Sequence, residues 1–320
     1  MDPNPLIPLV VVLGPTGTGK SVLAIKIAQE FDGEIINCDS LQLYRGFDIG
    51  TAKVPVDLRG GVPHHLIDVL APTELFTAGE YARAARKVLL DVAKRARIPV
   101  VVGGTGFYLR ALLEGLFPGP ARDEAIRTRL QTREGRRPGS LHRVLSRLDP
   151  AAASRIHPHD KNKTIRALEV RILEGKPISA LFEKGRAPLS GFRPIKFGLD
   201  PARELLYRRL DARAIGIFER GLIEEVRQLL GAGVPRNGKP FESLGYKQAL
   251  QVVEGFLTPE EALQSTQLET RRYAKRQLTW FRKEPDVHWL HGFGDDASVQ
   301  KEALAIMAQQ SPPRQAGTEL

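Results

Sequence analysis

The sequence of 320 residues contains a single cysteine, Cys38, and no apolar run long enough to cross a bilayer. One cysteine excludes an intrachain disulfide and a cysteine-built zinc site. A membrane-spanning helix needs about 20 consecutive apolar residues, so none is expected. No basic segment precedes the first apolar run, and a signal peptide is therefore not expected. These absences predict a globular protein of a reducing compartment, which we interpret as the cytoplasm.

Positive charge is in excess, with a formal net charge of +10. Residues 122–184 hold 15 Lys or Arg against 8 Asp or Glu, and residues 271–283 carry Lys and Arg without any acid. Such clusters are typical of proteins that bind a polyanion such as nucleic acid. Solvated helix faces give the same composition. Charge alone leaves both interpretations open.

Apolar runs alternate with helical spacing in the first third of the chain. Strands are expected over residues 10–13, 34–40 and 98–106, with helices over 21–31 and 81–97 between them. This order predicts an α/β fold with a doubly wound parallel sheet. Ligands of such sheets bind at the carboxyl ends of the strands.

Two stretches rich in Pro and Gly, residues 115–122 and 185–194, interrupt the chain. Between them the pattern favours short helices without a strand, and residues 195–200 are again typical of a strand. Long helices are expected within 205–230 and 259–283. The predicted organisation is a phosphate-loop α/β core with C-terminal helices over 1–121 and 185–310, a helical insertion over 122–184, and a disordered tail over 311–320.

Residues 14–21, GPTGTGKS, fit the pattern G-x-x-x-x-G-K-[ST] between a predicted strand and a predicted helix. In loops of this kind backbone N–H groups and a helix N-terminus hold a phosphate group. The lysine adds a positive charge, and the Ser or Thr hydroxyl can bind Mg²⁺. The expected phosphate site is Gly14, Pro15, Thr16, Gly17, Thr18, Gly19, Lys20 and Ser21, with Ser21 as a ligand of Mg²⁺.

In proteins that use ATP, a second strand usually ends in an acid that holds Mg²⁺. The strand expected at 98–106 ends instead in glycines and a threonine. Asp68 is a weaker substitute. This disfavours ordinary ATP chemistry. Asp39, after the strand at 34–40, could bind a metal, serve as a general base or cap a turn, and the cap is the commonest role for an isolated Asp there. His64 and His65 are expected to be structural.

Eight motifs, taken in order, resemble the bacterial tRNA dimethylallyltransferases, also called isopentenyl-tRNA transferases. The first is GPTGTGKS, and the basic motif TRRYAKRQLTWFRK is the last. Together they extend over most of residues 9–290. The matching stretches are 14–21, 34–53, 62–69, 101–113, 155–170, 221–229, 243–250 and 270–283.

The resemblance implies transfer of a dimethylallyl group from dimethylallyl diphosphate to N6 of adenine 37 in tRNA. The phosphate loop would then hold a diphosphate leaving group together with Mg²⁺. Asp39 matches the family's general base, which replaces the capping interpretation. Arg213 stands where the family has an arginine that we assign to the diphosphate, and Ser21 completes the expected catalytic group.

Contacts with the anticodon stem-loop are implied for two sets of residues. One set surrounds the adenine, and the other lies in the helical insertion, where basic residues would meet phosphates. Asn162 and Lys163 depart from the Gln-Arg that relatives often have. The expected tRNA contacts are Asp39, Ser40, Leu41, Gln42, Thr105, Arg127, Asn162, Lys163, Thr164, Ile165 and Arg166.

Two other enzymes would carry the same loop: a small-molecule kinase, with Asp39 activating a hydroxyl, and an isopentenyltransferase acting on free adenylate. A small acceptor needs neither the basic insertion nor the cluster at 271–283, which favours tRNA. A non-catalytic RNA-binding protein leaves the phosphate loop unexplained. We also expect a monomer, no membrane partner, and no zinc finger of the kind that eukaryotic relatives carry.

Overall fold

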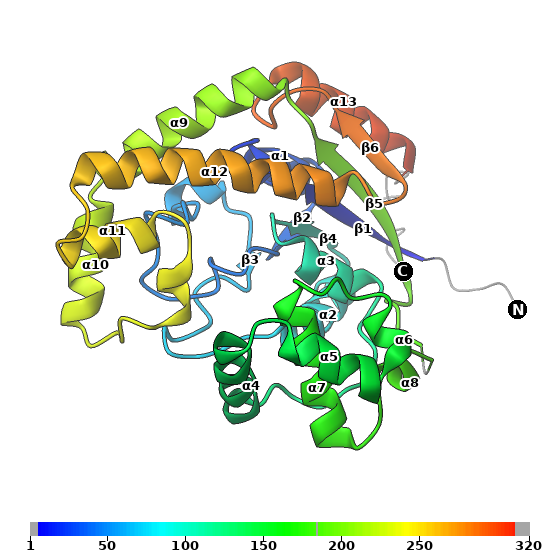
Figure 1. The fold of residues 1–320 in the computed structure, drawn as a ribbon. Helices are drawn as coiled ribbons and strands as arrows, with labels where there is room; N and C mark the ends of the chain where they lie inside the picture. The colour runs from blue at the N-terminus through cyan, green and yellow to red at the C-terminus, as the bar shows by residue number, and fades with distance from the viewer. Residues whose placement is uncertain (1–5, 184, 311–320) are drawn as a thin grey trace, which may run out of the picture. The chain divides into compact units, whose positions relative to one another are not determined.

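A six-stranded sheet, in the order β3-β2-β4-β1-β5-β6 and parallel throughout, organises the chain (Figure 1). The structure is a computed structural model and describes residues 6–183 and 185–310; the tail expected at 311–320 lies outside them. The α/β fold with a parallel sheet is confirmed. The strands are β1 (Ile7–Leu13), β2 (Gly33–Asn37), β3 (His64–His65), β4 (Ile98–Val102), β5 (Phe192–Leu199) and β6 (Val287–Leu290).

Helices connect and cover these strands. The chain clusters into two compact units, one of residues up to 112 and from 190 onward, the other of residues 113–189. The larger unit contains α1 (Lys20–Glu30), α2 (Ala78–Lys94), α3 (Gly106–Leu113), α9 (Arg203–Glu219), α10 (Leu222–Gly231), α11 (Tyr246–Val253), α12 (Pro259–Phe281), α13 (Ala297–Gln310) and the 3₁₀ turns η1 (Val56–Arg59) and η2 (Lys239–Glu242).

Alternating side chains of the central strands divide between the two faces of the sheet. Val10 and Val12 of β1 join a core with α1 and α13 that includes Leu23, while Val11 points to the other face. On this sheet α2 packs against β2 and β4. Because β1 is buried on both faces, its sequence is a continuous apolar run.

The boundaries of several elements differ from those expected. The helical stretch expected within 205–230 is two helices, α9 and α10, because Gly221 takes a left-handed φ of 93° between them. Helix α12 confirms the long helix expected at 259–283 and begins at a capping box of Thr258 and Glu261. Helices α9 and α12 run side by side (Figure 1).

The smaller unit has a core of its own and only helices among its described residues. Leu145 and Leu168 are both buried there. The backbone N–H of Leu189 donates to the carbonyl of Leu113, which pairs the two ends of the unit. The helices beyond α3 are α4 (Glu124–Arg136), α5 (Ser140–Leu148), α6 (Pro150–Ala153), α7 (Lys161–Glu174) and α8 (Ile178–Glu183).

No helix of the described residues is both long enough and apolar enough to span a membrane.

Candidate active site

The phosphate loop joins β1 to α1 at the carboxyl edge of the sheet. Gly17 and Gly19 have φ of 77° and 81°, and a Cβ on Gly17 would lie 2.6 Å from Leu210 Cδ2. The hydroxyl of Thr18 donates to the carbonyl of Pro15 at 2.9 Å, and the N–H of Gly294 donates to the carbonyl of Thr18 at 2.8 Å. Only glycine fits the left-handed backbone at these close approaches. The loop is therefore held rigidly around the N-terminus of α1.

Lys20 is the first residue of α1, and it is half-buried. It donates to the carbonyl of Pro15 at 2.6 Å. Burial lowers the pKa of Lys20 to about 8; the charge of Asp39 opposes this shift and that of Arg213 adds to it. Desolvation disfavours the charged form of a lysine. An anion bound in the loop would stabilise the charged form of Lys20.

Asp39 follows β2 and lies at the same edge of the sheet. Its Oδ1 accepts from the N–H of Leu41 at 3.0 Å, while its own N–H donates to Asn37 Oδ1 at 2.9 Å. The carboxylate therefore caps a short turn with one oxygen, and its charge still acts on Lys20 and Arg213. The cap and the proposed base role use different oxygens and are compatible.

The turn after Asp39 is tied to the loop after β4. The N–H of Ser40 donates to Thr105 Oγ1 at 3.1 Å, and the N–H of Thr105 donates to the carbonyl of Cys38 at 3.2 Å. Gln42 donates its side-chain amide to the carbonyl of Thr51 at 3.3 Å. Hydrogen bonds thus tie the segment expected around the adenine to the loop after β4 and to Thr51.

A cavity of about 370 Å³ is lined by the phosphate loop together with Asp39 and Gln42, whereas Ser40, Leu41 and Thr105 are not among its lining residues. Arg213 reaches this cavity from α9. Its pKa is lowered by burial, and the charge of Asp39 opposes this shift only in part. The cavity brings together most of the predicted diphosphate site and three further predicted residues. It is lined by Thr16, Gly17, Gly19, Lys20, Ser21, Val22, Asn37, Asp39, Gln42, Thr51, Ala52, Val54, Val102, Gly103, Gly104, Arg209 and Arg213.

The donor set of this cavity fits Mg²⁺ only in part. No group of three or more His, Cys, Asp or Glu side chains within the described ranges could hold a metal by itself. Ser21 and Asp39 contribute one hydroxyl and one carboxylate to the same cavity. Mg²⁺ usually takes one or two protein ligands and completes its shell with phosphate oxygens and water. The residues present fit an ion that arrives with a diphosphate.

Several residues of the site were missed by the sequence analysis. Gln277 of α12 accepts from the N–H of Thr16 at 2.9 Å and donates to the carbonyl of Gly104 at 2.8 Å. Burial raises the pKa of Tyr273 to about 12, with a contribution from the charge of Asp39. Both lie in the basic motif at 270–283. The motif was recognised, but spacing does not reveal which of its residues reach a loop 261 positions away.

The remaining predicted tRNA contacts belong to the helical unit. Arg127 donates from Nε to Glu169 at 2.9 Å, and Arg166 donates to the same buried carboxylate at 2.7 Å. Thr164 and Ile165 are 2% and 3% exposed, so their side chains pack in the core of the unit. The expectation that Thr164 and Ile165 contact tRNA stays a prediction, and the burial of both side chains leaves such contacts to the backbone of this turn. Asn162 and Lys163, on the first turn of α7, are exposed.

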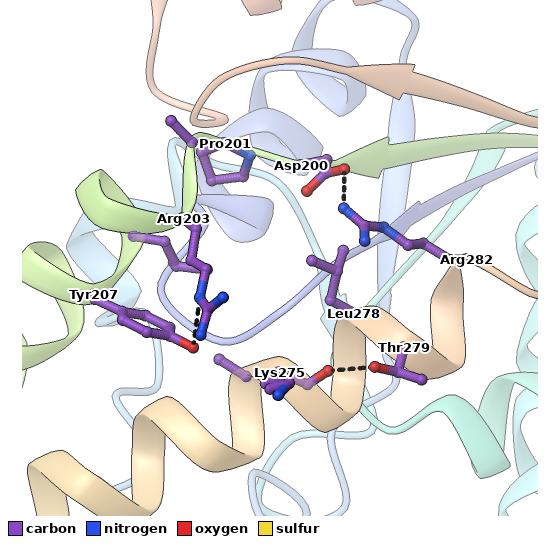
Figure 2. Close-up of a pocket in the computed structure, with 11 residues that line it drawn as sticks. Asp200, Pro201, Arg203, Tyr207, Lys275, Leu278, Thr279 and Arg282 are labelled. Carbon is purple, nitrogen blue, oxygen red and sulfur yellow. Dashed lines mark hydrogen bonds and ion pairs between the residues drawn. The ribbon is translucent and has the colours of Figure 1, made fainter.

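A second cavity, of about 390 Å³, lies between the loop after β5, α9 and α12 (Figure 2). Arg203 donates to the hydroxyl of Tyr207 at 3.2 Å, and Arg282 donates to Asp200 at 3.0 Å. This second cavity is lined by none of the predicted site residues. Two of its cations, Arg203 and Arg282, are engaged by Tyr207 and Asp200. We assign the chemistry to the cavity at the phosphate loop, where the predicted residues gather.

The fold and the cavity at the phosphate loop define a phosphate-loop transferase. Strand β4 neighbours β1, and no acid follows it, since Val102 is succeeded by two glycines. The carboxylate opposite the loop comes instead from the end of β2. A phosphorylated donor held in the loop would therefore share its cavity with the Asp39 carboxylate.

Comparison with known proteins identifies the transferase family. The IPP transferase family matches residues 42–284. A tRNA dimethylallyltransferase of Solibacter usitatus is 57% identical over 302 residues, which is 94% of this chain and 98% of that protein. One of Geobacter sulfurreducens is 43% identical over 284 residues, 88% of this chain and 91% of that protein.

Solved structures agree with the sequence comparison. The tRNA isopentenylpyrophosphate transferase of Bacillus halodurans is 36% identical with a TM-score of 0.71, covering 95% of this chain and 96% of that one. A eukaryotic dimethylallyltransferase acting on tRNA has a TM-score of 0.79 at 28% identity, covering 97% of this chain and 81% of that one. The chain belongs to the IPP transferase family of tRNA dimethylallyltransferases.

Proposed function

We propose that the cavity at the phosphate loop transfers a dimethylallyl group from dimethylallyl diphosphate to N6 of adenine 37 in tRNA. The product is N6-isopentenyladenosine, and diphosphate is released. The observation that carries the proposal is that Lys20, Arg213 and Asp39 line one cavity of about 370 Å³, which thus contains two cations and one carboxylate. This arrangement suits a reaction that needs an anion stabilised and a proton removed.

The donor is held by the phosphate loop. Backbone N–H groups at the N-terminus of α1, the ammonium of Lys20 and the guanidinium of Arg213 neutralise the diphosphate as its bond to carbon breaks. Mg²⁺, held by the Ser21 hydroxyl, would supply further positive charge to the leaving group when bound. Gly14, Pro15, Thr16, Gly17, Thr18 and Gly19 shape the loop.

The acceptor enters beside Asp39. Adenine 37 leaves the stack of the anticodon loop, which costs a few kcal/mol. Its N6 attacks the first carbon of the allyl group while the carbon–oxygen bond to diphosphate breaks. The free oxygen of the Asp39 carboxylate takes the proton from N6. Ser40, Leu41, Gln42 and Thr105 line the path of the base.

The helical insertion binds the stem of the same RNA. Exposed cations on α4 and on the first turn of α7, among them Arg129, Arg133 and Lys163, suit contact with phosphates. Arg127 and Arg166 share the Glu169 carboxylate and fix α4 against α7. Asn162 is exposed on the same turn as Lys163. These exposed cations support the assignment of residues 122–184 as the part of the protein that binds the anticodon stem.

One experiment separates this activity from its rivals. In two reactions, labelled dimethylallyl diphosphate and Mg²⁺ are incubated with the protein and either unmodified tRNA or AMP. In a third reaction, the protein and Mg²⁺ are incubated with ATP and small hydroxyl acceptors, without the prenyl donor. Label should enter tRNA alone. Label in AMP but not in tRNA indicates the free-adenylate enzyme, and ATP turnover without prenyl transfer indicates a kinase. Either result would overturn the proposal.

The base role is tested by Asp39→Asn, which keeps an oxygen for the Leu41 N–H but cannot accept the proton. We expect the transfer rate to fall at least about 100-fold, the usual contribution of a general base. Diphosphate affinity should survive. The control is Asp57→Asn, at an exposed aspartate of η1. A rate for Asp39→Asn equal to that of the control would remove Asp39 from the mechanism.

A further inference from the structure

Residues 47–53, which we call the acceptor loop, form one side of the cavity although no strand pairs with them among the described residues. Thr51 and Ala52 line the cavity, and the carbonyl of Thr51 accepts the side-chain amide of Gln42. Ala52 has a φ of 48°, a left-handed conformation that is unfavourable for alanine. Such a conformation persists only where surrounding contacts hold the backbone in place.

Two side chains far along the sequence bind the backbone just before Ala52, whose own N–H donates to the carbonyl of Ile49 at 3.1 Å. Glu225 of α10 accepts from the N–H of Ile49 at 2.8 Å and from the N–H of Asp48 at 3.3 Å. The hydroxyl of Tyr246, on α11, accepts from the N–H of Gly50 at 3.1 Å and donates to the carboxylate of Glu225. Three consecutive backbone N–H groups of the loop are thus bound by one carboxylate–phenol pair.

The ring of Tyr246 also fixes the loop by contact. A Cβ on Gly50 would lie 2.4 Å from the ring, so the backbone lies flat against it. Phe47 packs edge-on against the same ring at 4.9 Å between centroids. The Tyr246 side chain is buried, and its burial with the charge of Glu225 raises its pKa. The hydroxyl therefore stays protonated and can donate to Glu225 while it accepts from Gly50.

We propose that Glu225 and Tyr246 are positioning residues for the acceptor: they hold the acceptor loop, and through Thr51 they hold Gln42, in the place where adenine binds. The inference rests on the proposed function. The pair touches neither the phosphate loop nor Asp39 in any contact described above. The donor side has separate supports, namely Gln277 on Thr16 and Gly294 on Thr18. Loosening the pair should weaken acceptor recognition and leave donor binding intact.

The test uses Tyr246→Phe, which keeps the ring against Gly50 and removes the hydroxyl, and Glu225→Gln, which keeps acceptor oxygen but removes the charge. The matched control is Glu224→Gln, an exposed neighbour on α10 that pairs with Arg227. Each full-length variant is assayed with an unmodified anticodon stem-loop RNA for kcat and KM, and with dimethylallyl diphosphate for Kd. Hydrogen exchange of the amides at 48–50 reports on the loop directly.

For Tyr246→Phe and Glu225→Gln we expect KM for the RNA to rise about tenfold, as one lost hydrogen bond to a charged group implies. Kd for dimethylallyl diphosphate should stay within about twofold, and exchange at 48–50 should accelerate. The double variant should add little to either single change because both act on one unit. Glu224→Gln should match the unmodified protein in all three measurements.

Other outcomes overturn the inference. Faster exchange at 48–50 with unchanged KM would show a structural role only. Equal losses for RNA and for dimethylallyl diphosphate would show a general loss of structure. Absence of transfer by the unmodified protein overturns the proposed function and this inference together, whereas normal transfer with unchanged constants in both variants overturns the inference alone.

Discussion

Lys20 shows how a single side chain is prepared for an anion. Its ammonium has one neutral partner, the carbonyl of Pro15, and lies near the guanidinium of Arg213. Burial disfavours its charged form, and the nearby Asp39 carboxylate offsets this only in part, so that the pKa of Lys20 is lowered to about 8. A diphosphate would replace the missing solvation with negative charge, so binding and protonation of Lys20 favour each other.

This coupling predicts a pH dependence of donor binding. The free protein loses the Lys20 proton above pH about 8, whereas the complex retains it to higher pH. Kd for dimethylallyl diphosphate should therefore rise above that pH, approaching about tenfold per pH unit for one linked proton. Titration calorimetry between pH 7 and 10 measures it.

Lys20→Arg provides the comparison, because arginine stays charged throughout this range. Its affinity should be lower than that of the unmodified protein at pH 7, since the guanidinium does not fit the ammonium's place. Its Kd should not vary with pH. If the Kd of the unmodified protein did not change between pH 7 and 10, Lys20 would either keep its proton throughout this range in the free protein or take no part in binding.

Helix α12 carries the clearest functional contact at the scale of a secondary-structure element. Gln277 accepts from the phosphate loop and donates to the loop after β4. Glycine at 104 leaves room for this side chain, since a Cβ there would lie 2.5 Å from its Nε2. One amide thus aligns the loop for the donor with the segment that carries Thr105.

Replacing Gln277 with leucine should loosen the phosphate loop. The substitution leaves the N–H of Thr16 and the carbonyl of Gly104 without their partner, which costs about 1–3 kcal/mol for each unsatisfied group when buried. We expect a lower Tm and weaker binding of dimethylallyl diphosphate by differential scanning fluorimetry and calorimetry. Thr279→Ala, an exposed position on the same helix, is the control. Unaltered donor binding by Gln277→Leu would show that the bridge does not support the loop.

Elements were predictable from the sequence where one local pattern specified them. The strands β1 and β4 are continuous apolar runs, and the phosphate loop has its glycines at defined spacing. Short strands such as β3, with two residues, have too few positions for a pattern. Gln277 and Glu225 were not predicted because their partners lie more than 170 residues away. Periodicity reports the neighbours of a residue along the chain, and these contacts are made by the fold.

At the scale of the whole molecule, the helical insertion has a boundary that composition places imperfectly. The unit extends over residues 113–189, beyond the 122–184 expected between the Pro/Gly-rich breaks. Its ends pair through Leu113 and Leu189 and through the ion pair of Glu114 with Arg186. The first break, residues 115–122, lies inside the unit, whereas the second, residues 185–194, crosses its end at residue 189. Its role in binding tRNA remains a prediction.

That role predicts a specific salt dependence. Lys161 and Lys163 are exposed on the first turn of α7, where they would neutralise phosphates and release counterions. Replacing both with alanine should weaken binding of tRNA and reduce the slope of log affinity against log salt by about 1.5 for two lost phosphate contacts. The control replaces Lys87 and Lys94, exposed on α2 of the larger unit, with alanine. Equal slopes in the two double variants would show that net charge, rather than this surface, attracts the RNA.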